Sequence, residues 1–267
     1  EETPLIAAAA VALLREGGVH AGALQLLPGD GEVGAALVAD PRTQGVMFTG
    51  STEVARLIRG RLAERLSPDG RTIPLVAETG GQNALIVDSS ALAEQVVADV
   101  LTSAFDSAGQ RCSALRLLCL QEDVADRTLA MLKGALDELA VGDPAKLSTD
   151  VGPVITAAAR DGIEAHVARM GERGFAITRR EPAAEAAHGI FVPPTIVEID
   201  RPAVLEREVF GPVLHVVRYR REALDDLVAE INGLGYGLTF GVHSRIDETI
   251  ADLKARVAAG NVYVNRN

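Results

Sequence analysis

The spacing of apolar and polar residues along the chain alternates between two periods. Apolar residues three and four positions apart predict amphipathic helices, and short apolar runs between turn residues predict buried strands. Helices are expected at residues 5–16, 32–39, 51–66, 96–108, 124–139, 156–170, 222–232 and 247–258. Strands are expected at 23–27, 45–48, 72–77, 83–87, 116–120, 213–218, 238–243 and 262–264, with another inside 189–199. Strand–helix–strand units at this spacing predict an α/β fold built on a parallel sheet.

Two of these elements lead to residues that are candidates for catalysis or ligand binding. The helix that begins before residue 96 has one apolar face and is expected to end near Ala108, so that Cys112 follows directly after it. The helix at 51–66 has Ser51 or Thr52 as its cap. The apolar run at 115–120 predicts a buried strand, in which Cys119 is expected to be a core residue only.

Composition and charge exclude several classes of protein. Of 267 residues, 48% are hydrophobic, which is enough for one large or two modest domains with a substantial core. The formal net charge is −11, from 26 basic and 37 acidic residues, and no basic cluster offsets it. Such a surface repels phosphate, so we expect no nucleic-acid binding through this segment.

No transmembrane segment and no metal site are expected either. The longest apolar run, at 5–14, is too short to span a bilayer and lacks the basic start of a signal peptide. Two cysteines cannot build a disulfide framework, and reduced thiols suit a cytoplasmic protein. The five histidines lack metal-ligand spacing. The chain has no initiating methionine and opens within a motif, which indicates an internal fragment of a longer protein.

Cys112 is the candidate nucleophile, within Gly-Gln-Arg-Cys-Ser-Ala. A thiolate adds to an aldehyde to give a thiohemiacetal, whose oxyanion the backbone N–H of Cys112 is placed to stabilise. Hydride loss to an oxidised nicotinamide then leaves a thioester. Arg111 is a neighbour that favours the thiolate. The alternative for a lone cysteine is a small buried hydrophobic residue.

Glu78, in Glu-Thr-Gly-Gly, is the candidate base that activates water for thioester hydrolysis. Gly80 and Gly81 allow the chain to fold tightly beside it. The alternative is a solvated glutamate in a turn. Gly50 and Ser51 open a helix after a buried strand, and a helix N-terminus of this kind can hold a pyrophosphate. An ordinary strand-to-helix turn is the other interpretation.

The words FTGS, ETGGQNA, GQRCSA, EREVFGPV, GYGLTFGVHSR and GNVYVN occur in an order and at spacings that resemble the aldehyde dehydrogenase superfamily over nearly the whole chain. The longer stretches VAETGGQNA and SAFDSAGQRCSA are similar to the glutamate-semialdehyde (pyrroline-5-carboxylate) dehydrogenase modules of the bacterial proline utilization A family. The resemblance implies a partial Rossmann-type NAD-binding domain at 1–78 and an α/β catalytic domain at 79–267, truncated at its C-terminus.

The resemblance also implies roles for individual residues. Cys112 matches the family's nucleophile and Glu78 the glutamate that activates hydrolytic water. Contacts to the NAD cofactor are implied for Glu1, Gly50, Ser51, Glu208 and Phe210. Of these, Glu1 matches an acid that contacts the adenosine ribose, and Glu208 and Phe210 match the nicotinamide-ribose side. Ser113 resembles a serine that helps to hold the substrate carboxylate.

The implied reaction is NAD-dependent oxidation of glutamate semialdehyde to glutamate, the second step of proline catabolism. The family's upstream oxyanion asparagine and downstream substrate-anchoring loop are absent from this chain, so we expect residues 1–267 alone to be a poor enzyme. The resemblance further implies a homo-oligomeric parent, bifunctional, with FAD in a separate half and peripheral inner-membrane association.

Three alternatives stay open at this point. The first is an aldehyde dehydrogenase for a different aldehyde. The second is a non-catalytic structural copy of the fold, which would need neither Cys112 nor Glu78. The third is a cysteine hydrolase, although the scattered histidines give no Cys–His signature.

Overall fold

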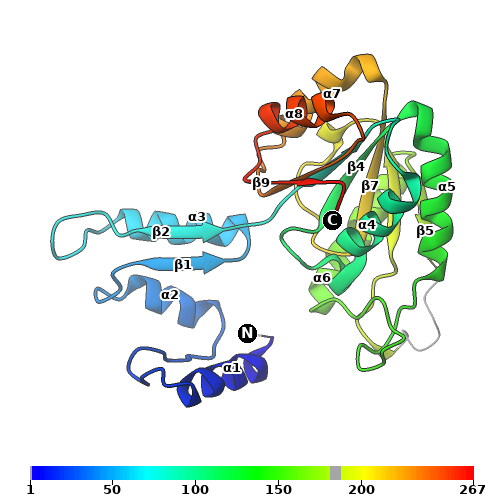
Figure 1. Ribbon diagram of the computed structural model, residues 1–267. Coiled ribbons are helices and arrows are strands. Elements are labelled where there is room, and N and C mark those ends of the chain that lie inside the picture. Colours follow the sequence, from blue (N-terminus) through cyan, green and yellow to red (C-terminus); the bar gives the residue numbers. More distant parts are fainter. Residues whose placement is uncertain (1, 181–187) are drawn as a thin grey trace. The chain divides into compact units, whose positions relative to one another are not determined.

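The computed structural model describes residues 2–180 and 188–267. The chain divides into two compact units, Glu1–Thr79 and Gly80–Asn267, and each is described by itself (Figure 1). Within the described residues, no helix is long and apolar enough to cross a membrane, and no group of three or more His, Cys, Asp or Glu side chains is placed to hold a metal ion.

The first unit combines three helices with a two-stranded parallel sheet. Its elements are α1 (Pro4–Glu16), α2 (Gly31–Ala39), β1 (Val46–Thr49), α3 (Thr52–Ala63) and β2 (Leu75–Glu78). Strand β1 pairs with β2 in parallel, as the strand–helix–strand pattern predicts. The Oγ of Ser51 accepts a hydrogen bond from the N–H of Val54 and caps α3, which confirms the predicted cap.

The strand expected at 23–27 is wrong. These residues form a turn followed by irregular backbone without ladder pairing in the described chain. The carbonyl oxygen of Leu24 instead accepts a hydrogen bond from the Arg15 side chain at 2.9 Å. A short apolar run becomes a strand only where a neighbouring strand satisfies its backbone groups, and this segment has none.

The second unit is built on a seven-stranded sheet in the order β5-β6-β7-β4-β3-β8-β9. The strands are β3 (Asn83–Val87), β4 (Leu115–Gln121), β5 (Ala176–Arg179), β6 (Thr195–Ile199), β7 (Val213–Tyr219), β8 (Thr239–His243) and β9 (Asn261–Val264). All pair in parallel except β5, an antiparallel edge strand that the hydrophobic pattern did not predict. Two of the four residues of β5 are exposed, so it lacks the apolar run of the other strands.

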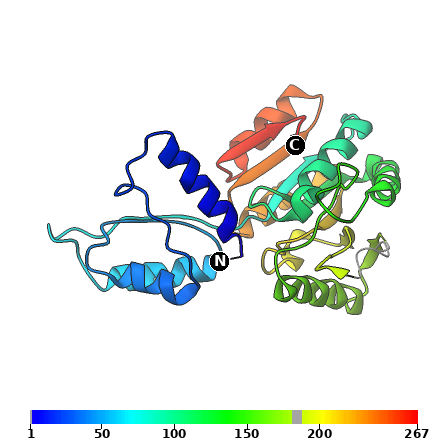
Figure 2. The same ribbon diagram turned by 90° about the horizontal axis from the view of Figure 1, so that it is seen from below.

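Helices cover both faces of this sheet. They are α4 (Ala93–Phe105), α5 (Glu122–Glu138), α6 (Ala157–Glu172), α7 (Leu224–Gly233) and α8 (Asp247–Arg256), with short 3₁₀ turns at Asp106–Gly109, Pro202–Val204 and Arg221–Ala223. Helices α4 and α5 pack against each other on one face (Figure 2). The chain then crosses from β7 to β8 in the opposite direction along the sheet, and right-handed crossovers therefore place α7 and α8 on the other face.

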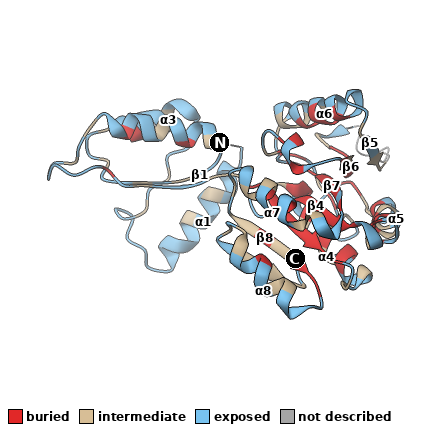
Figure 3. Ribbon diagram, turned by 90° about the horizontal axis from the view of Figure 1, so that it is seen from above, coloured by how far each residue is buried: buried red, intermediate tan, exposed pale blue. Residues whose placement is uncertain are grey.

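The central strands form the core of the second unit. Every residue of β3 and β4 is buried, and in β7 only Arg218 is exposed. Figure 3 shows the buried residues gathered around β4 and β7. Strands buried on both faces need continuous apolar runs rather than alternation, which is why the sequence signals them as short hydrophobic blocks. Cys119 lies in β4 with no exposed surface, and burial raises the pKa of its thiol, which confirms it as a core residue.

Two buried histidines connect α6 to the sheet. The Nε2 atoms of His166 and His215 lie 2.8 Å apart, and Nδ1 of His215 lies 3.1 Å from the carbonyl oxygen of Arg116. Burial lowers the pKa of His166 to about 4, with a further effect of nearby arginines, and lowers that of His215 to about 3, helped by the adjacent His166. Both rings are therefore neutral near neutral pH.

Acidification is expected to destabilise the fold through this pair. The unfolded histidines take up protons below their ordinary pKa of 6.5, whereas the folded ones do not until the pH approaches 4 and 3. The free energy of unfolding is therefore highest above pH 6.5. It falls as the pH drops below 6.5, by up to about 1.4 kcal/mol per pH unit for each of the two histidines. Urea unfolding from about pH 7 to about pH 5 measures this slope. A His166→Gln variant with the same slope would contradict the assignment.

Candidate active site

The backbone before Cys112 adopts an unusual conformation. Helix α4 ends earlier than expected, and the 3₁₀ turn Asp106–Gly109 covers the region near Ala108. Ser107, Ala108 and Gly109 have φ of 57°, 54° and 64°, in the left-handed region that non-glycine residues rarely adopt. A Cβ on Gly109 would overlap the carbonyl oxygen of Gly211, so the glycine allows a close approach of the two chain segments. Strained backbone of this kind is typical of functional loops.

The two residues before Cys112 hold its loop against the rest of the second unit. The Oε1 of Gln110 accepts a hydrogen bond from the N–H of Ile155 at 2.8 Å. The guanidinium of Arg111 donates to two carbonyl oxygens in the last turns of α4, at 2.8 and 3.1 Å, where it complements the negative end of the helix. Cys112 itself is exposed. The loop thus carries an accessible thiol directly after two anchored residues.

Asn83, the first residue of β3, holds the Cys112 loop through hydrogen bonds to its backbone. Its buried Nδ2 donates to the carbonyl oxygens of Cys112 at 2.7 Å and Ala114 at 2.8 Å, and its Oδ1 accepts from the N–H of Thr239 at 3.2 Å. A Cβ on Gly81 would lie 2.7 Å from the carbonyl oxygen of Cys112 and 2.6 Å from Oδ1 of Asn83. Only glycine therefore fits where the chain passes the nucleophile loop.

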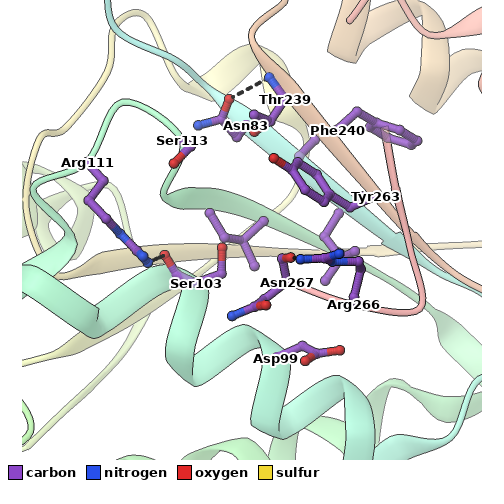
Figure 4. Close-up of a pocket in the computed structure, with 14 residues that line it drawn as sticks. Asn83, Asp99, Ser103, Arg111, Ser113, Thr239, Phe240, Tyr263, Arg266 and Asn267 are labelled. Carbon is purple, nitrogen blue, oxygen red and sulfur yellow. Dashed lines mark hydrogen bonds between the residues drawn. The ribbon is translucent and has the colours of Figure 1, made fainter. Parts of the chain in front are cut away.

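A pocket of about 230 Å³ lies beside the loop. Figure 4 shows Ser113, Asn83 and Thr239 at one end of it and Asp99 at the other. Arg111 and Arg266 are among its lining residues, as is Tyr263 of β9. The pocket is predominantly polar and carries guanidinium groups, which suits a small ligand with a negative charge.

Glu208 belongs to a buried ion pair. Its Oε1 lies 3.2 Å from Nη2 of Arg116, and the two side chains are 13% and 1% exposed. Burial raises the pKa of Glu208, opposed by the charge of Arg116 and by a hydrogen bond from the N–H of Gly81. Burial likewise lowers the pKa of Arg116, opposed by Glu208. The arginine also lies 5.4 Å from the ring centroid of Phe210, which is 43% exposed.

The first unit carries the other predicted site residues. Gly50 donates its N–H to the carbonyl oxygen of Glu78 at 3.0 Å, so the two motifs are adjacent at the end of the small sheet. Ser51 follows as the cap of α3, and the side chain of Glu78 is exposed. Glu1 lies outside the described residues. The predicted site residues thus form two groups, one in each unit, with Ser113, Cys112, Glu208 and Phe210 in the second.

The sequence interpretation missed two residues that shape the second group. Arg116 is the one charged residue within the apolar run of β4, and that charge was a signal of a buried partner. Asn83 begins β3 as a polar residue before an apolar block, a weaker signal. Both act on residues far away in the sequence, which local patterns do not show.

A family model, described as the aldehyde dehydrogenase family, matches residues 1–267. The chain belongs to the aldehyde dehydrogenase family. The resemblance seen in the sequence is thereby confirmed, together with the α/β fold, because solved members superimpose on the chain.

Among proteins, the chain is 62% identical to the bifunctional protein PutA of Klebsiella aerogenes, with all of this chain and 21% of that protein covered. It is 35% identical to a 1-pyrroline-5-carboxylate dehydrogenase of Geobacillus kaustophilus, with 99% of this chain and 51% of that protein covered. It therefore spans about a fifth of the length of its PutA relatives and about half that of the dehydrogenase.

Among solved structures, a bifunctional proline utilization A protein matches at 55% identity and a TM-score of 0.93, over 99% of this chain and 26% of that one. A betaine aldehyde dehydrogenase from Staphylococcus aureus, in complex with NAD+ and with one modified cysteine, matches at 26% identity and a TM-score of 0.90, over 99% of this chain and 53% of that one. Family membership is thus supported by both sequence and fold.

Proposed function

We propose that this chain is the catalytic part of an NAD-dependent dehydrogenase that oxidises L-glutamate γ-semialdehyde to L-glutamate. The observation that carries the proposal is the exposed Cys112, held through its own carbonyl oxygen by Asn83. A structural copy of the fold needs no accessible thiol in an anchored, strained loop. The names of the PutA and 1-pyrroline-5-carboxylate dehydrogenase relatives support the choice of aldehyde.

The proposed reaction starts with the Cys112 thiolate, which adds to the aldehyde carbon and forms a thiohemiacetal. The backbone N–H of Cys112 donates to the resulting oxyanion. NAD+, when bound, accepts the hydride of the former aldehyde carbon, and a thioester remains on Cys112. Glu78 then takes a proton from water, which attacks the thioester and releases the carboxylic acid and the thiolate.

The residues present fit a dinucleotide. The first-turn N–H groups of α3 point away from the helix, and the Oγ of Ser51 accepts from that of Val54. Gly50 and Ser51 lead into this helix N-terminus, which suits a pyrophosphate. Glu208 accepts hydrogen bonds and suits ribose hydroxyls, and the exposed Phe210 offers an apolar surface. We therefore assign NAD contacts to these four residues, and to Glu1 from the motif resemblance alone, and propose residues 1–78 as a partial cofactor domain.

The substrate carboxylate is assigned to the pocket beside Cys112. Ser113 is a hydrogen-bond donor there, and the guanidinium groups of Arg111 and Arg266 give this pocket positive charge. For the full-length protein, the names of the PutA relatives support the proposal of a bifunctional enzyme. The motif resemblance alone leads us to propose a homo-oligomer with FAD in a separate half, located in the cytoplasm or peripherally at the inner membrane.

The test is NADH formation by the full-length protein with glutamate semialdehyde and with a panel of simple aldehydes. A strong preference for glutamate semialdehyde is expected. Activity on a different aldehyde would support the same chemistry with another substrate. Betaine aldehyde belongs in the panel because the chain is similar to a betaine aldehyde dehydrogenase. The absence of turnover with every aldehyde would contradict the proposal.

The Gly80→Ala variant tests the role of Glu208. A Cβ at this position would overlap Oε2 of Glu208, so the carboxylate must move. We expect the KM for NAD+ to rise on the order of tenfold, since a displaced charged contact is worth about 1–3 kcal/mol. The matched control is Gly134→Ala in α5, where nothing lies within 4 Å of the added Cβ. An unchanged KM for NAD+ in Gly80→Ala would rule out this role of Glu208.

A further inference from the structure

Arg116 lies in the second unit where β4 meets two loops, the one that carries Cys112 and the one that carries Glu208. It is the second residue of β4, four positions after Cys112, and its side chain is 1% exposed. A guanidinium does not lose its charge in proteins, so burial demands acceptors that replace water. The acceptors of Arg116 lie in two loops that carry predicted site residues, so its role extends beyond packing in the core.

Its hydrogen bonds join the nucleophile loop to the loop of Glu208. Nη2 donates to the carbonyl oxygen of Arg111, directly before Cys112, at 3.1 Å and to Oε1 of Glu208 at 3.2 Å. Nη1 donates to the carbonyl oxygen of Gly211 at 2.9 Å. The planar fork thus contacts both loops through two nitrogen atoms, and the single nitrogen of an ammonium group cannot occupy the positions of both.

Glu208 is confined from the opposite side as well. The N–H of Gly81 donates to its carboxylate, and Gly80 leaves the space that Oε2 occupies. The N–H of Glu208 donates to the hydroxyl of Tyr236 at 3.4 Å. The ring of Phe210 lies against the Arg116 guanidinium. Removal of the arginine charge would leave Glu208 buried without its cation and free this loop.

We propose that Arg116 is a positioning residue, which holds Glu208 and Phe210 in one fixed arrangement with the backbone that precedes Cys112. It touches neither substrate nor cofactor and acts through these neighbours. The consequence for NAD+ rests on the proposed function, in which Glu208 contacts the cofactor. The consequence for Cys112 does not, because it concerns only the loop that carries the thiol.

The test compares Arg116→Lys, Glu208→Gln and the double variant in the full-length protein. NAD+ affinity is measured by calorimetry, and alkylation of Cys112 by iodoacetamide is followed by mass spectrometry of its peptide. Arg116→Lys is expected to weaken NAD+ binding on the order of tenfold and to change the alkylation rate several-fold. The double variant should bind NAD+ about as weakly as Glu208→Gln alone, since coupled residues are non-additive.

The matched control is Arg179→Lys, which alters an ion pair with Glu164 on β5 and α6 and should change neither quantity. Additive effects in the double variant, or unchanged NAD+ affinity and alkylation in Arg116→Lys, would overturn the proposal. If the wild-type protein neither binds NAD+ nor oxidises an aldehyde, the proposed function fails. In that case the alkylation rate alone tests the positioning role: a changed rate in Arg116→Lys supports it, and an unchanged rate contradicts it.

Discussion

Replacement of Cys112 by alanine in the full-length protein is expected to reduce kcat/KM for NADH formation from glutamate semialdehyde by at least about 10³-fold. Without the thiol, no covalent adduct forms, and the aldehyde hydrate is a poor hydride donor. The substitution removes a single exposed sulfur atom, while the contacts that hold the loop involve the Cys112 carbonyl oxygen. Stability measured by thermal unfolding should therefore be unchanged.

Cys119→Ala is the matched control for this experiment. Its thiol is fully buried in β4, so the variant should lose on the order of 1 kcal/mol of stability yet turn over normally. The two cysteines thus separate chemistry from packing. Turnover that survives in Cys112→Ala would exclude the thiol mechanism, and loss of turnover in both variants would point to a general structural effect.

Glu78→Gln is expected to slow steady-state turnover by about 10²–10⁴-fold while sparing the first turnover. The amide preserves size but cannot accept a proton from water, so the thioester should form and persist. Rapid-mixing measurements should then show a burst of NADH equal to the enzyme concentration. The mass of the intact protein should increase by that of the acyl group on Cys112.

Glu32→Gln, an exposed acid in the first turn of α2 in the same unit, is the control and should behave as wild type. A Glu78→Gln variant that turns over at the normal rate would restore the interpretation of a solvated turn glutamate. If the burst itself is slowed and no acyl-enzyme accumulates, Glu78 acts before hydrolysis and its proposed role is wrong.

Much of the secondary structure could be predicted, because burial imposes local periodicity. The fully buried strands β3, β4 and β7 appear in the sequence as apolar blocks, and the face of α4 appears as spacings of three and four. The failures have the same origin. Residues 23–27 are apolar except for Gln25 but lack a neighbouring strand, and β5 is half exposed and lacks the apolar signal.

The candidate site could be predicted only in part. Motif words indicated Cys112 and Glu208 as site residues. The words did not indicate that Arg116 joins their two loops. Nor did they show that Asn83 and Gly81 hold the Cys112 carbonyl in a close-packed contact.

By itself, the sequence determined most of the helices and strands, that the sheet is mainly parallel, and which family the motif words resemble, since all of these follow from residues close together in the chain. The tertiary structure decided which distant residues meet. Asn83 and Cys112 are 29 positions apart, and Arg116 and Glu208 are 92 apart. These pairs meet because the sheet places β3 beside β4 and β4 beside β7, and strand order is a property of the whole packed core.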